Sequence, residues 1–348
     1  MNQHAKPRNV AAGAAKSWAG ETVPALSYPA PDRLHWASLS IGELLTSLAG
    51  SSTIWKVIPP SNPPLLAKLY NEKMRQRLKS ETAPAEQLLL LARYRSQLSR
   101  ELPFAAWPLS LVFSGSATIT EDNFTERLAG FTMVNLQATS SLAQLVSVPR
   151  VRHRLKSPDT LHIARTLLGQ IELLHAHPWR FVFGDLSASN VRVSNNFKQV
   201  FFIDTDSFQF TCPEAGHRSY TAAGTTPSFR SPGIRTQKQT TQLTEAHDTF
   251  VATILLFQLI MADVGVPNLH PFISSDSNPD DLIDRYAFPY EQPDRYPVSR
   301  YALDKYRALP VPIRKAFRQT FTTKNPVPLG QWRTLLGQHW RSLPRPSA

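Results

Sequence analysis

The sequence has little cysteine, little glycine and no long hydrophobic run. Cys212 is the one cysteine in 348 residues, which excludes an intrachain disulfide and a thiolate zinc site and fits a reducing, cytoplasmic setting. Only 14 glycines stand against 29 prolines, which argues against repeated Gly-rich phosphate-binding loops. The longest apolar stretch, 250–262, is shorter than the roughly 20 residues that cross a bilayer, so we predict no membrane-spanning helix.

The composition is that of a folded chain with a basic C-terminal region. Apolar residues make up 42% and charged residues 18%, enough to bury a core, and the length predicts about two domains or one two-lobed domain. The net charge is +12, and from Arg285 onward 12 Lys and Arg stand against 3 Asp and Glu. Such a surface can attract nucleic acid, an acidic membrane or an acidic partner. We favour a solvated face, because the aromatic residues there lie among prolines and predict packing.

The first part of the chain predicts a small antiparallel sheet with one helix. Residues 1–35 lack an apolar period and are rich in Ala, Pro and Ser, so we expect a flexible extension. The β-branched and aromatic run 53–57 and the run 65–70 predict a hairpin across a proline-rich turn. A helix is expected over 86–98, and two more strands over 109–113 and 128–134.

The second part predicts mostly helices. The stretch 161–175 has one broad apolar face, and 248–262 is apolar nearly all round, as a buried helix is. Short strands are expected over 191–193 and 200–203. Two further helices are predicted over 311–321 and 329–340.

Polar residues follow apolar strands at two places in this second part. Asp185 and Asn190 lie five residues apart in a polar loop, and Asp204 follows fourteen residues later, directly after a strand. Carboxylate and amide oxygens at strand ends contribute little to packing, but they are good ligands for a hard cation. These three residues are therefore the candidate site.

This pattern resembles the catalytic loop of protein kinases and the metal-binding Asp that follows it. The resemblance implies that Asp185 orients the acceptor hydroxyl, and that Asn190 and Asp204 hold Mg²⁺ beside ATP. It also implies an α+β, bilobal protein kinase-like fold. The N-lobe, 36–135, would hold the small antiparallel sheet, and the C-lobe, 136–348, would be mainly helical.

Residues of the first part fit the same resemblance. Lys68 is similar to the strand lysine that pairs with phosphates, and Glu86 to its ion-pair partner on a helix. Gly50, Ser51 and Ser52 stand in the place of the Gly-rich loop. The resemblance implies that these residues bind the nucleotide.

Three further segments extend the resemblance along the chain. Val134 and Asn135 stand where a strand leads into the hinge, which implies contact with the nucleotide. Residues 224–232 are similar to the end of an activation segment. Asp248 begins a helix like the one whose Asp holds the catalytic loop.

The sequence also departs from the kinase pattern. Gly50 is one glycine where the loop has three, and Gly184 stands where an Arg usually precedes the catalytic Asp. Ser187 replaces a lysine that stabilises transferred charge. Gly233 and Asn325 stand where Glu and Arg usually pair, so both partners of one ion pair are expected to be absent. These changes predict weaker nucleotide binding, slow turnover and activity that needs no phosphorylation of the segment.

Three functions remain open at this point. The favoured one is an ATP- and Mg²⁺-dependent kinase acting on Ser or Thr of a protein. The second is a pseudokinase scaffold that binds nucleotide and a partner protein, and the third an aminoglycoside-type phosphotransferase. The signature around Asp185 and Asp204 is similar to a bacterial kinase branch linked to tellurite-resistance-type neighbourhoods. That likeness implies a PP2C-type phosphatase and a von Willebrand-type protein as partners.

Overall fold

The chain divides into two compact units. The computed structural model describes residues 17–47, 52–115, 118–222, 224–234, 242–262 and 270–342. One unit comprises residues 1–95 and 108–135, and the other comprises 96–107 and 136–348. No helix in these described ranges is long and apolar enough to cross a membrane.

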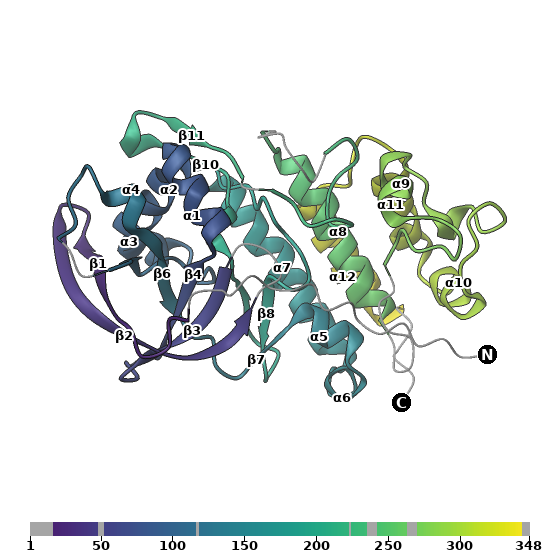
Figure 1. Ribbon diagram of the computed structural model, residues 1–348. Helices are drawn as coiled ribbons and strands as arrows, with labels where there is room; N and C mark the ends of the chain where they lie inside the picture. Colours follow the sequence, from purple (N-terminus) through teal and green to yellow (C-terminus); the bar gives the residue numbers. More distant parts are fainter. Residues whose placement is uncertain are drawn as a thin grey trace, which may run out of the picture. The chain divides into compact units, whose positions relative to one another are not determined.

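The first unit is built on a closed barrel of antiparallel strands. Neighbours around the barrel are β1-β2-β3-β4-β6-β5, and β5 pairs with β1 to close it (Figure 1). The strands are β1 (Thr22–Ala30), β2 (Arg33–Ser47), β3 (Ser52–Ile58), β4 (Leu65–Tyr70), β5 (Ser110–Phe113) and β6 (Leu128–Val134). The predicted hairpin is confirmed as β3 and β4, which pair antiparallel from Ser52–Tyr70 to Lys56–Leu66.

The prediction of a flexible extension over 1–35 is wrong for its second half. Residues 1–16 lie outside the described residues, but β1 pairs with β2 and β5 and buries Val23 and Leu26. Two prolines, Pro24 and Pro29, interrupt the apolar alternation of this strand. The strand was not predicted, because proline usually argues against a strand. With β1 and β2 added, the predicted small sheet becomes a barrel.

The barrel strands carry a hydrophobic cluster on each face. Alternate side chains of a strand point to opposite faces, so Leu66 and Tyr70 share one face and Ala67 and Leu69 the other. The cluster on the Tyr70 face also contains helix residues, which can pack only on the outside of a barrel. Lys68 has the same parity as Leu66 and Tyr70, so it belongs to the outer, helix-covered face.

The helices of the first unit are α1 (Glu72–Ser80), α2 (Thr82–Arg93) and the short α4 (Phe124–Arg127). Asn71 caps α1 by accepting the Met74 N–H at 2.9 Å. One helix was predicted over 86–98, but the structure has α2 and then α3 (Arg95–Glu101), separated at Tyr94. The outer face of the barrel packs against Leu78 of α1 and Leu88 of α2.

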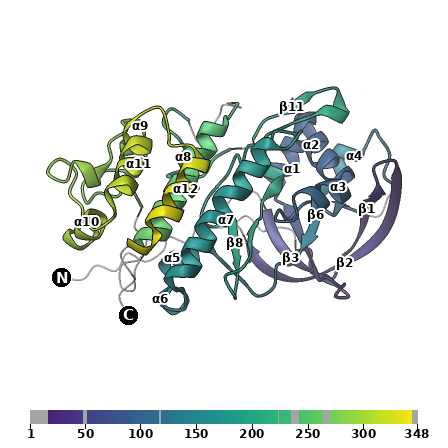
Figure 2. The same cartoon turned by 180° about the vertical axis from the view of Figure 1, so that it is seen from behind.

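The second unit has a helical core. In α8 (Glu245–Met261) every residue from His247 to Met261 is buried, which confirms the prediction from its all-round apolar pattern. This helix lies beside α7 (Ser157–Ala176), and α12 (Leu329–His339) packs on α7 (Figures 1 and 2). The predicted helix 311–321 is confirmed as α11 (Val311–Thr322).

Small sheets and short helices complete this unit. The predicted strands 191–193 and 200–203 are confirmed as β8 (Val191–Ser194) and β9 (Val200–Phe202), in a sheet with β7 (Thr139–Ser141). Elements that were not predicted are β10 (Phe210–Cys212), β11 (Arg218–Tyr220), α5 (Leu142–Ser147), α6 (Pro149–Arg152), α9 (Pro279–Asp284) and α10 (Arg300–Arg307). All are short, so each carries too few residues for a clear hydrophobic period.

The aromatic residues of the basic C-terminal region serve mainly packing. Tyr290, Tyr296 and Tyr306 are buried, and Tyr306 donates its hydroxyl to Glu291 at 2.6 Å. Burial raises the pKa of both Tyr290 and Tyr306 above the ordinary value. These three rings are therefore not available as a surface on which bases stack.

Candidate functional site

The polar loop after Phe183 is held by the first turn of α8. Asp248 is fully buried, and its Oδ2 accepts the Phe183 N–H at 2.8 Å. The same oxygen lies 2.9 Å from His175 Nε2 on α7. A buried carboxylate that bonds a backbone N–H and a ring nitrogen fixes the start of the loop in place.

Gly184 has a steric reason to lack a side chain. A Cβ at this position would overlap the Ala222 Cβ and lie 2.5 Å from the Ser207 carbonyl oxygen. The backbone of 184 therefore packs directly against the segment from Ser207 and the segment from Ala222. An arginine would not fit there without moving one of them, which explains this departure from the kinase pattern.

Asp185 and Asn190 contact each other and the segment that contains Thr226. Asn190 Nδ2 donates to the Asp185 carbonyl oxygen at 2.8 Å and to Asp185 Oδ2 at 3.3 Å. The Thr226 N–H donates to Asp185 Oδ1 at 2.7 Å, and the Thr226 hydroxyl donates to the same oxygen. Both carboxylate oxygens of Asp185 are therefore oriented.

The pKa of the Asp185 carboxyl is raised above its ordinary value. Burial is the largest cause, because it penalises the charged form, and the negative charge of Asp204 adds to it. The hydrogen bonds from Thr226 and Asn190 act in the opposite direction. A raised pKa makes Asp185 a better proton acceptor than an exposed aspartate.

Asp204 lies at a left-handed turn two residues after the end of β9. Its φ of 64° and ψ of 36° place it in the left-handed helical region, which Asp adopts more readily than most residues do. The turn is stabilised because the Ser207 N–H and hydroxyl donate to the Asp204 carbonyl oxygen at 3.0 and 2.7 Å. The Ile203 N–H donates to the Asn190 carbonyl oxygen at 3.0 Å, which ties this turn to the loop of Asn190.

The donors present fit a divalent cation that shares its coordination with a ligand. The Asn190 side chain donates to Asp185 through Nδ2, so its Oδ1 is the atom that could bind a cation, and the Ile203–Asn190 backbone hydrogen bond joins its loop to the turn of Asp204. Among the residues that the structure describes, no group of three or more His, Cys, Asp or Glu could hold a metal. The protein alone therefore offers a partial oxygen site, as is usual for Mg²⁺ completed by waters and phosphate oxygens.

The segment 224–234 is fixed to α9 by an ion pair that the sequence did not predict. Arg230 Nη1 and Nη2 lie 2.6 and 2.9 Å from the two Asp284 oxygens, and the Gly233 N–H donates to Asp284 Oδ1 at 3.1 Å. Asp280 accepts the Ser228 N–H at 3.0 Å. The expected Glu–Arg pair at positions 233 and 325 is absent because neither residue carries a charge, and a different ion pair holds the segment, with its cation on the segment and its anions on α9.

His270 holds the same segment from another side. Its Nδ1 accepts the Phe272 N–H at 3.2 Å, so Nε2 is the nitrogen that donates to the Ser228 carbonyl oxygen at 2.9 Å. Full burial lowers the pKa of His270 to about 4, so the ring is neutral near pH 7. Ser228 itself has a φ of 65°, a conformation these contacts maintain.

Lys68 and Glu86 lie in the first unit. Lys68 is on β4, opposite Ile54 of β3 and Phe131 of β6, and only 4% of it is exposed. Its Nζ lies 5.6 Å from the centre of the Phe131 ring. Glu86 is half-buried on α2, next to Ala85 and two positions from Leu88, which both pack on the outer barrel face.

The other predicted nucleotide-binding residues also belong to this unit. Ser52 is buried at the start of β3, and Val134 ends β6 opposite Leu65. The Asn135 N–H donates to the Pro64 carbonyl oxygen at 2.9 Å. Gly50 and Ser51 lie outside the described residues.

Comparison with known proteins identifies the fold. Neither protein-family models nor curated proteins match this sequence. Among solved structures, a rhoptry kinase from Toxoplasma gondii is similar, with a TM-score of 0.53 over 93% of this chain and 86% of that chain. The chain has a protein kinase-like fold. At 14% sequence identity the likeness concerns the mixed α+β fold.

Proposed function

We propose that this protein transfers the γ-phosphoryl group of ATP, with Mg²⁺, to a Ser or Thr hydroxyl of a protein substrate. One observation carries the proposal. In a chain with a kinase-like fold, Asp185, Asn190 and Asp204 lie together, and burial and Asp204 raise the pKa of Asp185.

Each residue has a distinct part in this proposal. Asp185 would orient the acceptor hydroxyl and take its proton, while the bonds from Thr226 keep the carboxylate aligned. Asn190 Oδ1 and the Asp204 carboxylate would hold Mg²⁺, which supplies neutralisation of phosphate charge. Lys68, with Glu86 as its partner, would contribute a positive charge from the first unit. Gly50, Ser51, Ser52, Val134 and Asn135 would contact the nucleotide.

A second candidate function is a nucleotide-binding scaffold. Ser187, where kinases carry a lysine, is only 4% exposed and has no charge to offer a transferred phosphoryl group. The close packing of Gly184 also leaves no place for an arginine. On this alternative the protein would bind ATP and a partner without turnover, and a PP2C-type phosphatase or a von Willebrand-type protein would be the partners to test first.

The decisive experiment measures transfer from labelled ATP with Mg²⁺ to mixed protein substrates. Asp185→Asn and Asp204→Asn should each lower the rate by roughly 10²–10⁴-fold, because one removes the proton acceptor and the other a metal ligand. Asp294→Asn, which removes an exposed carboxylate elsewhere in the same unit, should leave the rate unchanged. Equal rates in wild type and Asp185→Asn would exclude the proposed role.

Nucleotide binding separates the alternatives. Binding of ATP with Mg²⁺ that raises the melting temperature without any transfer supports the scaffold. Transfer to an aminoglycoside but to no protein supports a small-molecule phosphotransferase. Absence of both binding and transfer contradicts all three functions.

A further inference from the structure

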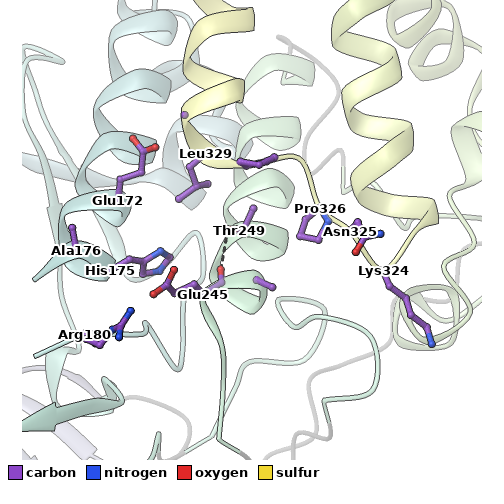
Figure 3. A pocket seen from close by; sticks show the side chains of 13 residues that line it. Glu172, His175, Ala176, Arg180, Glu245, Thr249, Lys324, Asn325, Pro326 and Leu329 are labelled. Carbon is purple, nitrogen blue, oxygen red and sulfur yellow. Dashed lines mark hydrogen bonds between the residues drawn. The ribbon is translucent and has the colours of Figure 1, made fainter.

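The second unit contains a cavity outside the loops of Asp185 and Asp204. Its volume is about 680 Å³, within the range usual for ligand sites. The end of α7, the first turn of α8 and the segment 324–330 line it (Figure 3). None of its lining residues is among those proposed to contact the nucleotide, the metal or the acceptor hydroxyl, although His175 bonds the Asp248 that holds the Asp185 loop.

One wall of the cavity carries two carboxylates. Figure 3 shows Glu172 of α7 and Glu245 of α8 on the same side as the His175 ring, while Lys324 points away. Glu172 Oε2 pairs with Arg333 Nη1 at 2.7 Å, and its Oε1 lies 3.0 Å from where a Cβ of residue 330 would be. Glycine at 330 thus leaves this carboxylate room.

Glu245 is the less satisfied of the two acids. It is exposed, and its carboxylate has no hydrogen-bond or ion-pair partner within the described part of the chain. Pro326, Pro328 and Leu329 give the lining an apolar wall, and Figure 3 shows Leu329 next to Glu172 and Pro326 farther along the segment. Carboxylates next to an apolar wall match a side chain that has an aliphatic stem and a cationic head.

We propose that this cavity binds a basic peptide, with an arginine side chain between Glu172 and Glu245 and apolar flanking residues on the wall of Pro326, Pro328 and Leu329. An arginine can serve both carboxylates at once, because its guanidinium presents five donors in a fixed plane. Arg180, an exposed cation of the lining, repels a second cation, so the arginine head of the occupant would lie toward the glutamates and away from Arg180.

The occupant would lie beside a residue that reaches the Asp185 loop. His175 lines the cavity, and its Nε2 lies 2.9 Å from the Asp248 oxygen that accepts the Phe183 N–H. Phe183 stands two residues before Asp185. A peptide that restrains His175 therefore restrains the start of this loop, and this effect does not require the protein to be a kinase.

The binding test measures the dissociation constant of a defined probe, acetyl-Pro-Arg-Pro-Leu-amide, by calorimetric titration of the full chain. Wild type should bind it roughly tenfold more tightly than Glu245→Gln does, since a charge-assisted pair is lost. Asp294→Asn is the matched control and should bind like wild type, and Arg180→Gln should bind as well or better. The proposal is overturned by equal binding of acetyl-Pro-Gln-Pro-Leu-amide, by preferred binding of the Pro-Glu-Pro-Leu probe, or by no binding.

The coupling is tested by hydrogen exchange of the amides over 181–190. The arginine peptide should slow their exchange in wild type, and the effect should shrink in His175→Gln while binding persists. Unchanged exchange in saturated wild-type protein overturns the coupling. Because neither readout depends on phosphoryl transfer, failure here and failure of the proposed function are distinguishable.

Discussion

The two units place their candidate residues by different physical means. In the first unit Lys68 lies within a regular ladder, between Ile54 of β3 and Phe131 of β6, so the register of the sheet fixes its position. In the second unit Asp185 and Asp204 lie on irregular backbone, and single polar contacts fix them. A residue that is held by many weak contacts should tolerate a nearby substitution better than one held by a few strong contacts. We therefore expect the candidate residues of the second unit to be more sensitive to point substitution.

Asp248 and Thr132 give the largest expected contrast. Asp248→Ala leaves the Phe183 N–H and His175 Nε2 unpaired in a buried place and should cost about 3 kcal/mol of unfolding free energy. Thr132 of β6 is buried, and its hydroxyl has no partner within the described residues, so Thr132→Val should be neutral or stabilising by about 1 kcal/mol. Denaturant unfolding of both variants checks this. A larger loss of unfolding free energy in Thr132→Val than in Asp248→Ala would contradict the expected difference between the two units.

Two glycines of the second unit sharpen the comparison at a smaller scale. Gly184→Ala must displace Ala222 or the Ser207 carbonyl and should cost about 2 kcal/mol. Gly337 lies exposed in α12 with no atom near its missing Cβ, so Gly337→Ala should stabilise by about 0.5–1 kcal/mol. Melting temperatures of the two variants should move in opposite directions. A rise in the melting temperature of Gly184→Ala would show that the loop has room for a Cβ at position 184.

Thr226→Val should have the smallest effect, visible in the pH profile. Loss of the Thr226 hydroxyl removes a bond that lowers the pKa of Asp185, so this already raised pKa rises further. The acid limb of the pH–rate profile of phosphoryl transfer should then move to higher pH, since the ionised carboxylate is the active form. Because the folded pKa exceeds the unfolded one, Asp185 favours the folded state at acid pH and loses this contribution as pH rises through the folded pKa. Thr226→Ser, which keeps the hydroxyl, should show the acid limb of the pH–rate profile at the same pH as wild type.

The success of prediction from sequence also differs between the units. The β3–β4 hairpin and buried α8 could be predicted because their apolar patterns are local and strong. The barrel could not, because Pro24 and Pro29 disguise β1 and its closure depends on pairing with the distant strand β5. Asp185, Asn190 and Asp204 lie within 20 residues, so a local motif could nominate them as site residues, and their role stays a prediction.

The ion pair of Arg230 shows why the rest of the site was missed. Its partner Asp284 is 54 residues away on the short helix α9, and no local pattern links the two. The same holds for His270, which bonds the Ser228 carbonyl oxygen 42 residues earlier. Contacts of this kind depend on the tertiary fold, and a single sequence does not reveal them.

Closure of the barrel has a consequence for how other proteins can approach the first unit. Each of the six strands has two neighbours in the closed order, but β2 pairs with β1 over Arg33–Ser40 and with β3 over Ser40–Ser47. An added strand could therefore pair only along stretches bonded on one side, such as 33–39, and not along a whole edge strand. Elsewhere on the barrel, a protein that recognises this unit must read its side chains and loops.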